Sequence, residues 1–304
     1  MEKINACIAA LRETAPEIQV AEHEPMCRHT TFAIGGPADL FVTPKTPEQL
    51  TQALRVIRGC GLPLLLLGNG SNMLVSDAGY RGAVVCTTEL DEVHATADGC
   101  VVAQAGALLA RVARRAQRAG LTGAEFSGGI PGSVGGAVFM NAGAYDGQMA
   151  GIVEKTDYLD GNGEMHTLEG EEHCFGYRSS AFRAHPDWTV VQTVLRLQPG
   201  DPAAILDKMN DFAQRRRDKQ PLNFPSAGST FKRPEGYFAG RLIEDAGLKG
   251  VSVGAAQVSE KHAGFLINRG GATCEDMLRL IELVQQRVRD QFGVELECEV
   301  RIVR

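Results

Sequence analysis

Glycine is concentrated in two short segments of this 304-residue chain. Half of the segment 127–136, SGGIPGSVGG, is glycine, and a second cluster, GNGSN, occupies residues 68–72. Because glycine has no Cβ, backbone N–H groups can converge there and a ligand can approach the main chain. Converging N–H groups form an anion-binding site. Two such clusters predict a ligand with two phosphates or one extended nucleotide, and tight turns without a ligand remain the alternative.

The two clusters do not fit the common nucleotide-binding motifs. The run from Gly68 begins like G-x-G-x-x-G, but Met73 stands where the third glycine belongs, and the following residues do not open a helix. The chain also has no G-K-[ST] sequence, so it carries no P-loop. A dinucleotide bound outside a Rossmann fold indicates a flavin domain of another type.

Length, charge and cysteine usage exclude several classes of protein. A chain of 304 residues predicts two or three domains, and the formal net charge of −6 argues against a general nucleic-acid binder. None of the eight cysteines has C-x-x-C spacing, and the adjacent pair His173 and Cys174 is a poor metal site, so we expect reduced thiols and no metal. The acidic N-terminal segment and the lack of a long apolar run predict a cytoplasmic protein without a membrane partner. We expect a monomer or a weak oligomer.

Residue periodicity predicts a mixture of helices and strands. Thr46 and Pro47 mark the start of a helix over 47–58, and Thr273 with Asp276 resembles a capping box before a long helix with an apolar stripe. The other helices are predicted at 108–119 and 202–217, with a hairpin over 153–170 and strands at 64–67, 79–88, 99–107, 188–200 and 294–303.

Six segments, in this order along the chain, resemble one family, the UDP-N-acetylenolpyruvoylglucosamine reductases. These flavoenzymes of bacterial cell-wall synthesis serve cell shape and division. The segments are TTFAIGGPAD (30–39), LGNGSNMLVSDAGYRG (67–82), FSGGIPGSVGGAVFMNAGAY (126–145), FGYRSSAF (175–182), PSAGSTFKRP (225–234) and LECEVRIV (296–303). The resemblance covers almost the whole chain.

The resemblance implies an α+β fold with an FAD-binding domain of the vanillyl-alcohol-oxidase (PCMH) type. Two α+β subdomains, 1–88 and 89–200, would hold FAD, and an α+β substrate-binding domain would follow at 201–304. The first glycine loop contains no histidine, so FAD is expected to be noncovalent. The residues expected to bind FAD are Gly68, Asn69, Gly70, Ser71, Asn72, Gly129, Ile130, Pro131, Gly132, Ser133, Gly136 and Ala137.

The family reduces an enol ether of UDP-N-acetylglucosamine, with hydride passing from NADPH through the flavin N5 to the vinyl carbon. By resemblance, Arg178 contacts the substrate carboxylate, Glu299 helps to polarise it, and Ser229 protonates the adjacent carbon. The residues expected to bind substrate are Tyr177, Lys219, Lys232, Arg233, Gln257 and Asn268. The segment after Arg178 is short, as in family members that lack a closing loop with a tyrosine.

Two other functions remain open. The chain could be a sugar or lactone oxidase on the same flavin scaffold, although GYRSS, GSTFKRP and Glu299 argue against that. It could also be a nucleotide- or flavin-binding module without activity, although all three catalytic positions are filled.

Overall fold

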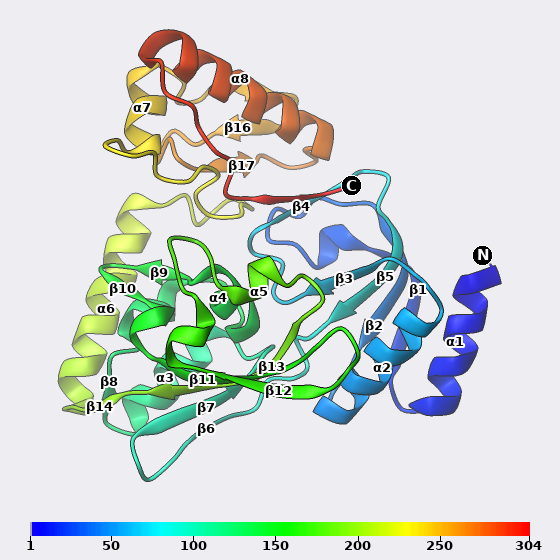
Figure 1. Cartoon of the computed structure of the whole chain (residues 1–304). Coiled ribbons are helices and arrows are strands. Elements are labelled where there is room, and N and C mark those ends of the chain that lie inside the picture. Colours follow the sequence, from blue (N-terminus) through cyan, green and yellow to red (C-terminus); the bar gives the residue numbers. More distant parts are fainter. Residues whose placement is uncertain (1) are drawn as a thin grey trace. The chain divides into compact units, whose positions relative to one another are not determined.

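A computed structural model of the protein describes residues 2–304 and divides the chain into two compact units. Unit 1 combines the chain up to Glu22 with Leu40–Asn69 and Gly82–Arg215, and unit 2 combines His23–Asp39, Gly70–Arg81 and Arg216–Arg304. The elements are labelled in Figure 1. The boundaries expected from sequence, at 88 and 200, stay a prediction. No helix among residues 2–304 is long and apolar enough to cross a membrane.

The first part of unit 1 contains most of a small sheet with two helices on one face. The sheet has the order β1-β2-β5-β3, with β1 at Gln19–Pro25, β2 at Pro37–Thr43, β5 at Tyr80–Cys86 and β3 at Leu64–Leu67. Helices α1 (Glu2–Thr14) and α2 (Pro47–Gly59) bury apolar side chains against β2 and β5 (Figure 1). The predicted start of α2 is confirmed, because the Thr46 hydroxyl accepts a hydrogen bond from the N–H of Gln49.

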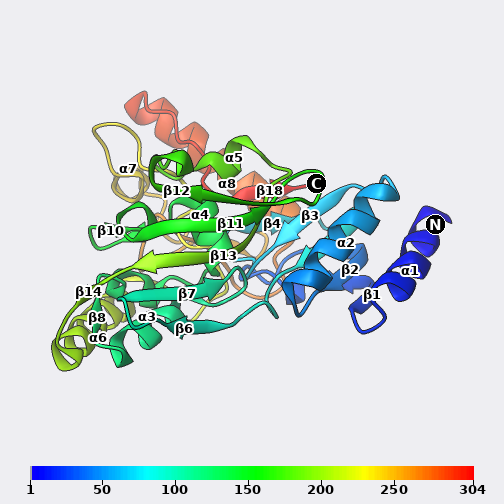
Figure 2. The ribbon, with the colours of Figure 1, turned by 60° about the horizontal axis from the view of Figure 1, so that its bottom comes forward.

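The second part of unit 1 is a five-stranded antiparallel sheet of order β12-β11-β13-β7-β6, shown side by side in Figure 2. The predicted hairpin is confirmed, since Leu159 pairs with Met165 and the Asp160 carboxylate accepts N–H bonds within the turn. The strands are β6 (Val93–Ala95), β7 (Cys100–Gln104), β11 (Val153–Leu159), β12 (Met165–Glu169) and β13 (Thr189–Arg196). Helices α3 (Leu109–Arg118), α4 (Val134–Met140) and α5 (Ala181–Ala184) pack on this sheet.

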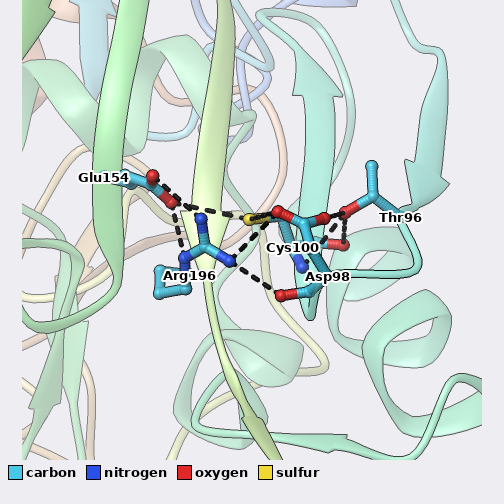
Figure 3. Close-up of polar contacts among 5 residues, drawn as sticks. All are labelled: Thr96, Asp98, Cys100, Glu154 and Arg196. Carbon is cyan, nitrogen blue, oxygen red and sulfur yellow. Dashed lines mark hydrogen bonds and ion pairs between the residues drawn. The ribbon is translucent and has the colours of Figure 1, made fainter.

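A polar network joins three neighbouring strands of this sheet at its surface (Figure 3). The Arg196 guanidinium donates to both carboxylate oxygens of Glu154 and to the carbonyl oxygen of Asp98, and this pairing lowers the pKa of Glu154. The Cys100 thiol lies 3.5 Å from the Glu154 carboxylate. All eight cysteines are free thiols, as expected from the sequence.

Unit 2 is built around one long helix, α8 (Cys274–Phe292). The capping box is confirmed, because Thr273 and Asp276 exchange side chain to backbone hydrogen bonds, and the helix ends at Gly293 with φ of 67°. The predicted stripe, Met277, Leu280, Ile281, Val284 and Val288, is buried. It belongs to a core shared with α7 (Ala239–Asp245) and the sheet β15 (Ser252–Val253), β16 (Ala256–Val258) and β17 (Leu266–Asn268).

The continuous terminal strand predicted at 294–303 is wrong. Only β18, Arg301–Val303, is a strand, and it pairs in parallel with β4, Met73–Val75. The residues before it bond elsewhere: the N–H of Lys232 donates to the carbonyl oxygen of Glu297, and the N–H of Glu299 donates to that of Thr230. An alternating pattern predicts extended backbone but not which partner the backbone takes.

Short elements complete the chain. They are η1 (Met26–Arg28), β8 (Leu121–Thr122), η2 (Glu125–Gly129), β9 (Gly143–Ala144), β10 (Gly147–Gln148), η3 (Met149–Gly151), η4 (Gly170–His173) and β14 (Gln198–Pro199). The 18-residue helix α6 (Pro202–Lys219) covers the helix predicted at 202–217.

Candidate active site

The two glycine clusters meet in unit 1. A Cβ on Gly68 would lie closer than 3.0 Å to the Ser133 hydroxyl oxygen, so the absence of a side chain at Gly68 leaves room for this hydroxyl. The Asn69 side-chain amide donates a 2.6 Å hydrogen bond to the carbonyl oxygen of Pro131. The structure therefore brings Gly68, Asn69, Pro131 and Ser133 together, although the two segments are more than 60 residues apart in sequence.

Part of the backbone of the second cluster forms hydrogen bonds to residues 105–109. The N–H of Val134 donates to Ala107, the N–H of Gly135 donates to Ala105, and the carbonyl oxygen of Gly132 accepts from Leu109. These N–H groups are therefore committed to the protein rather than to a ligand. Gly136, in the first turn of α4, is exposed, and the nearest atom to a Cβ built there is Ser133 Oγ at 3.6 Å.

Ser133 Oγ is buried and has no hydrogen-bond partner. A buried hydroxyl without a partner costs about 1–3 kcal/mol, so such atoms are rare unless a ligand or water satisfies them. The other residues predicted in this loop, Gly129 and Ile130, are half-buried, and Ala137 is buried with its N–H donated to the carbonyl oxygen of Ser133.

The rest of the first cluster, Gly70, Ser71 and Asn72, belongs to unit 2. Gly70 has φ of 58°, and its carbonyl oxygen accepts from the N–H of Thr31. The Asn72 side-chain amide donates to the carbonyl oxygen of Glu299 at 3.0 Å. Ser71 is half-buried. Asn72 thus positions the backbone of a predicted catalytic residue.

Arg178 lies in a tight turn of unit 1. The backbone groups of Gly176 and Ser179 bond to each other, and Arg178 between them has φ of 53°, a left-handed conformation that is uncommon for a residue other than glycine. The Arg178 guanidinium carbon lies 5.3 Å from the centroid of the exposed Tyr177 ring. Backbone conformations of this kind cluster at functional sites, so the turn supports the role predicted for Arg178.

His173 lies three residues before this turn in the chain. It is fully buried, its ring nitrogens lie 3.0 Å from the Gly170 carbonyl oxygen and 3.0 Å from the Thr156 hydroxyl, and it stacks on Phe175. Burial lowers the pKa of His173, so the ring is neutral at pH 7. Sequence reasoning judged His173 and Cys174 only as metal ligands and did not predict that His173 is a buried, hydrogen-bonded core residue.

Ser229 and Glu299 lie on adjacent segments of unit 2. Phe231 forms a bridge with Cys298, and the N–H of Glu299 donates to the carbonyl oxygen of Thr230 at 2.8 Å. Ser229 is exposed and Glu299 is half-buried. Two residues 70 positions apart in sequence are therefore neighbours through their backbones.

The residues predicted to bind substrate in unit 2 differ in the contacts that their side chains already make within the protein. Lys219 is exposed, Lys232 forms an ion pair with Glu297, and the Arg233 guanidinium carbon lies 3.9 Å from the Phe238 ring centroid. The buried Asn268 side chain donates to Phe32 and accepts from the N–H groups of Gly270 and Ala272. These contacts engage both polar atoms of the amide, so Asn268 has a structural task.

Gln257 lines a pocket of about 620 Å³ within unit 2. Three cationic side chains, Arg217, Lys261 and Arg269, share this pocket with one carboxylate, Glu260. The Gln257 amide donates to Gly250 and accepts from Arg269 at 2.9 Å. The excess of positive charge favours an anionic ligand, although the whole chain is acidic.

One group of possible metal ligands lies close together among residues 2–304: Asp160, Glu164 and His166, at the turn of the hairpin. The Asp160 Oδ1 atom already accepts hydrogen bonds from the N–H groups of Asn162 and Glu164, so this carboxylate stabilises the turn without a metal ion.

Comparison with known proteins shows the class of protein to which this chain belongs. Residues 38–169 match the FAD binding domain family. A solved structure of Phl p 4, a grass pollen allergen with glucose dehydrogenase activity, covers 64% of this chain and 44% of its own chain, at 17% identity and a TM-score of 0.51, which shows the fold alone. The α+β FAD-binding fold predicted from sequence is confirmed, and the chain is an FAD-dependent oxidoreductase.

Residues 220–303 match the C-terminal domain of UDP-N-acetylenolpyruvoylglucosamine reductase. The reductase of that name from Clostridium perfringens (strain SM101) is 50% identical over 293 residues, 96% of this chain and 96% of the relative. The crystal structure of the reductase from Thermus caldophilus has 35% identity and a TM-score of 0.79, and covers 95% of this chain and 99% of that one. The chain belongs to the UDP-N-acetylenolpyruvoylglucosamine reductase family.

Proposed function

We propose that this chain reduces UDP-N-acetylglucosamine enolpyruvate to UDP-N-acetylmuramate with NADPH, in the cytoplasmic synthesis of peptidoglycan precursors. Relatives that carry the reductase name match nearly its full length. The observation that carries the proposal is the pairing of the Ser229 segment with the Glu299 segment, within the part that matches the reductase C-terminal domain. We expect a monomer or a weak oligomer.

Noncovalent FAD fits the residues of the two glycine clusters. The buried, unpartnered Ser133 hydroxyl can donate to a phosphate oxygen, and Gly68 leaves the approach to it open. Asn69 holds the two loops together, and the exposed Gly136 lets a ligand approach the start of α4. FAD held by these residues would supply the hydride-transfer chemistry between NADPH and the vinyl CH2 carbon of the substrate.

Arg178 would bind the substrate carboxylate. Its guanidinium is always charged and planar, so it stabilises the negative charge that develops on the enol carboxylate when hydride arrives. The left-handed backbone of Arg178 sets the direction in which its side chain leaves the turn, and the guanidinium lies over the Tyr177 ring.

Glu299 and Ser229 would complete the chemistry. In its protonated form, Glu299 would donate a hydrogen bond to the substrate carboxylate, and Asn72 holds its backbone. The Ser229 hydroxyl would then donate a proton to the carbon next to that carboxylate. The exposed position of Ser229 leaves its hydroxyl accessible to a substrate.

The cationic residues of unit 2 would bind the phosphates of the substrate and of NADPH. Lys219, Lys232 and Arg233 are among the residues expected to bind substrate, and the pocket lined by Gln257 adds Arg217, Lys261 and Arg269. Because Lys232 is already paired with Glu297, its contribution requires that it share its charge with the ligand.

Anaerobic absorbance spectroscopy of the purified protein tests the proposal. Flavin bands should bleach with NADPH and return when the enolpyruvyl substrate is added. In the Ser229→Ala variant the bleaching should be unchanged, and the return should slow by about 10²–10⁴-fold, because general acid catalysis is lost. Ser226→Ala, in the same segment, is the matched control and should behave as wild type.

Other outcomes would point to the other functions. Flavin that stays reduced with the substrate present and reoxidises only with oxygen would favour a sugar or lactone oxidase. A protein that binds no flavin, even after reconstitution with FAD, would contradict both enzyme functions. A protein with flavin that NADPH does not bleach would favour a binding module without activity.

A further inference from the structure

Two adjacent threonines of unit 2 use their hydroxyl groups differently. The Thr30 hydroxyl donates to the carbonyl oxygen of Ile34 at 2.8 Å and accepts from its N–H at 3.3 Å. The Thr31 hydroxyl oxygen is buried and has no hydrogen-bond partner. The two residues have the same chemistry, so the difference lies in where the fold places them.

The backbone of Thr31 is held beside the first glycine cluster. The N–H of Thr31 donates to the carbonyl oxygen of Gly70 at 3.2 Å. A Cβ on Gly70 would lie closer than 3.0 Å to the carbonyl oxygen of His29, so the segment 29–31 packs directly on this glycine. Ala33, which follows, has φ of 55° and donates its N–H to Thr30. The segment is therefore a tight turn that fixes Thr31 against the loop.

A buried hydroxyl without a partner is costly, and a tight turn cannot relax easily to find one. The cost is offset if the partner arrives with a ligand. The neighbouring loop residue, Gly70, is one of those expected at FAD, and the phosphate oxygens of FAD are strong acceptors for a hydroxyl donor. We propose that the Thr31 hydroxyl donates a hydrogen bond to a phosphate oxygen of bound FAD, a role that rests on the assignment of residues 68–72 to FAD under the proposed function.

Three variants of the full-length protein test this role. Thr31→Val keeps the shape of the side chain and removes the hydroxyl. Thr31→Ser keeps the hydroxyl and removes the methyl group. Thr30→Val is the matched control, because it removes a hydroxyl that the protein itself uses. For each protein, FAD is titrated into the flavin-free form and followed by quenching of flavin fluorescence, and urea unfolding is measured without FAD.

The expected changes have different signs. Thr31→Val should raise the Kd for FAD about 10-fold or more, because a hydrogen bond to a charged acceptor is lost. Its unfolding midpoint without FAD should be equal to or above that of wild type, because an unsatisfied hydroxyl has been removed. Thr31→Ser should keep a Kd close to wild type. Thr30→Val should lower the unfolding midpoint and leave the Kd within about threefold.

The alternatives give separate results. A wild-type Kd for Thr31→Val would overturn the proposal and leave the hydroxyl to a structural water. A lower unfolding midpoint for Thr31→Val without FAD, with the same loss of affinity in Thr31→Ser, would show a packing role and would also overturn it. A wild-type protein that binds no FAD would instead refute the assignment of the loop to FAD, and with it this proposal.

Discussion

Replacement of Gly136 by alanine tests whether this glycine is needed for FAD binding rather than for the fold. Gly136 lies in the first turn of α4 and is exposed, and a Cβ there would meet only Ser133 Oγ, at an ordinary 3.6 Å. Its φ is not in the left-handed region. Alanine is more favourable than glycine within a helix by about 0.5–1 kcal/mol, so the flavin-free variant should be more stable than wild type by about that amount.

The same change should weaken FAD binding. If a phosphate of FAD approaches the backbone at Gly136, the added methyl group would push it away, and a loss of about 1.4 kcal/mol would raise the Kd for FAD 10-fold. Urea unfolding without FAD measures the first effect, and titration of the flavin-free protein with FAD measures the second. Gly136→Ala should therefore be more stable without the cofactor and less able to bind it.

Gly135→Ala is the matched control. A Cβ at Gly135 would lie 3.2 Å from the Cβ of Ala105 and 3.3 Å from its carbonyl oxygen, so the protein must shift to accept it. This variant should lose stability whether or not FAD is present. A Gly136→Ala protein that binds FAD as tightly as wild type would refute the reasoning, because the ligand would then not approach α4 at this glycine.

Two further predictions concern stability. Burial lowers the pKa values of His173 and His262, so the unfolded chain takes up protons first as the pH falls. The free energy of unfolding should therefore decrease from pH 7.5 to pH 5.5, and it should decrease less in His173→Gln. A free energy of unfolding in urea that does not change with pH would contradict this. The Arg58 guanidinium donates to the carbonyl oxygens of Asp160, Gly161 and Asp187, so Arg58→Met should destabilise by about 2 kcal/mol in thermal or urea unfolding, whereas Arg55→Met, exposed on the same helix, should change little.

Local sequence patterns predicted the elements whose causes are local. The capping box at Thr273 and the apolar stripe after it lie within one helix, so their spacing predicts both the start of α8 and its buried face. The turn residues at 160–163 predicted the hairpin for the same reason. The terminal strand was wrong because its pairing depends on residues 230–232, far away in sequence.

The candidate site residues were recognised as motifs, and the motifs alone do not show how each residue packs in the fold. A Cβ on Gly68 would displace the Ser133 hydroxyl, and a Cβ on Gly135 would press on Ala105. The sequence contains two threonines at 30 and 31 and offers no reason to separate them. Which hydroxyl has a partner follows from the turn that ends at Ile34 and from the contact with Gly70.

The sequence by itself determined the family, the FAD-binding class and the helices and strands whose patterns are complete within a few turns, because capping, periodicity and turn chemistry act between near neighbours. The tertiary structure decided which glycines serve the packing of the chain, which buried hydroxyls have no hydrogen-bond partner within the protein, and that the backbones of Ser229 and Glu299 are neighbours. These features arise from contacts between segments far apart in sequence, and such contacts exist only once the chain has folded.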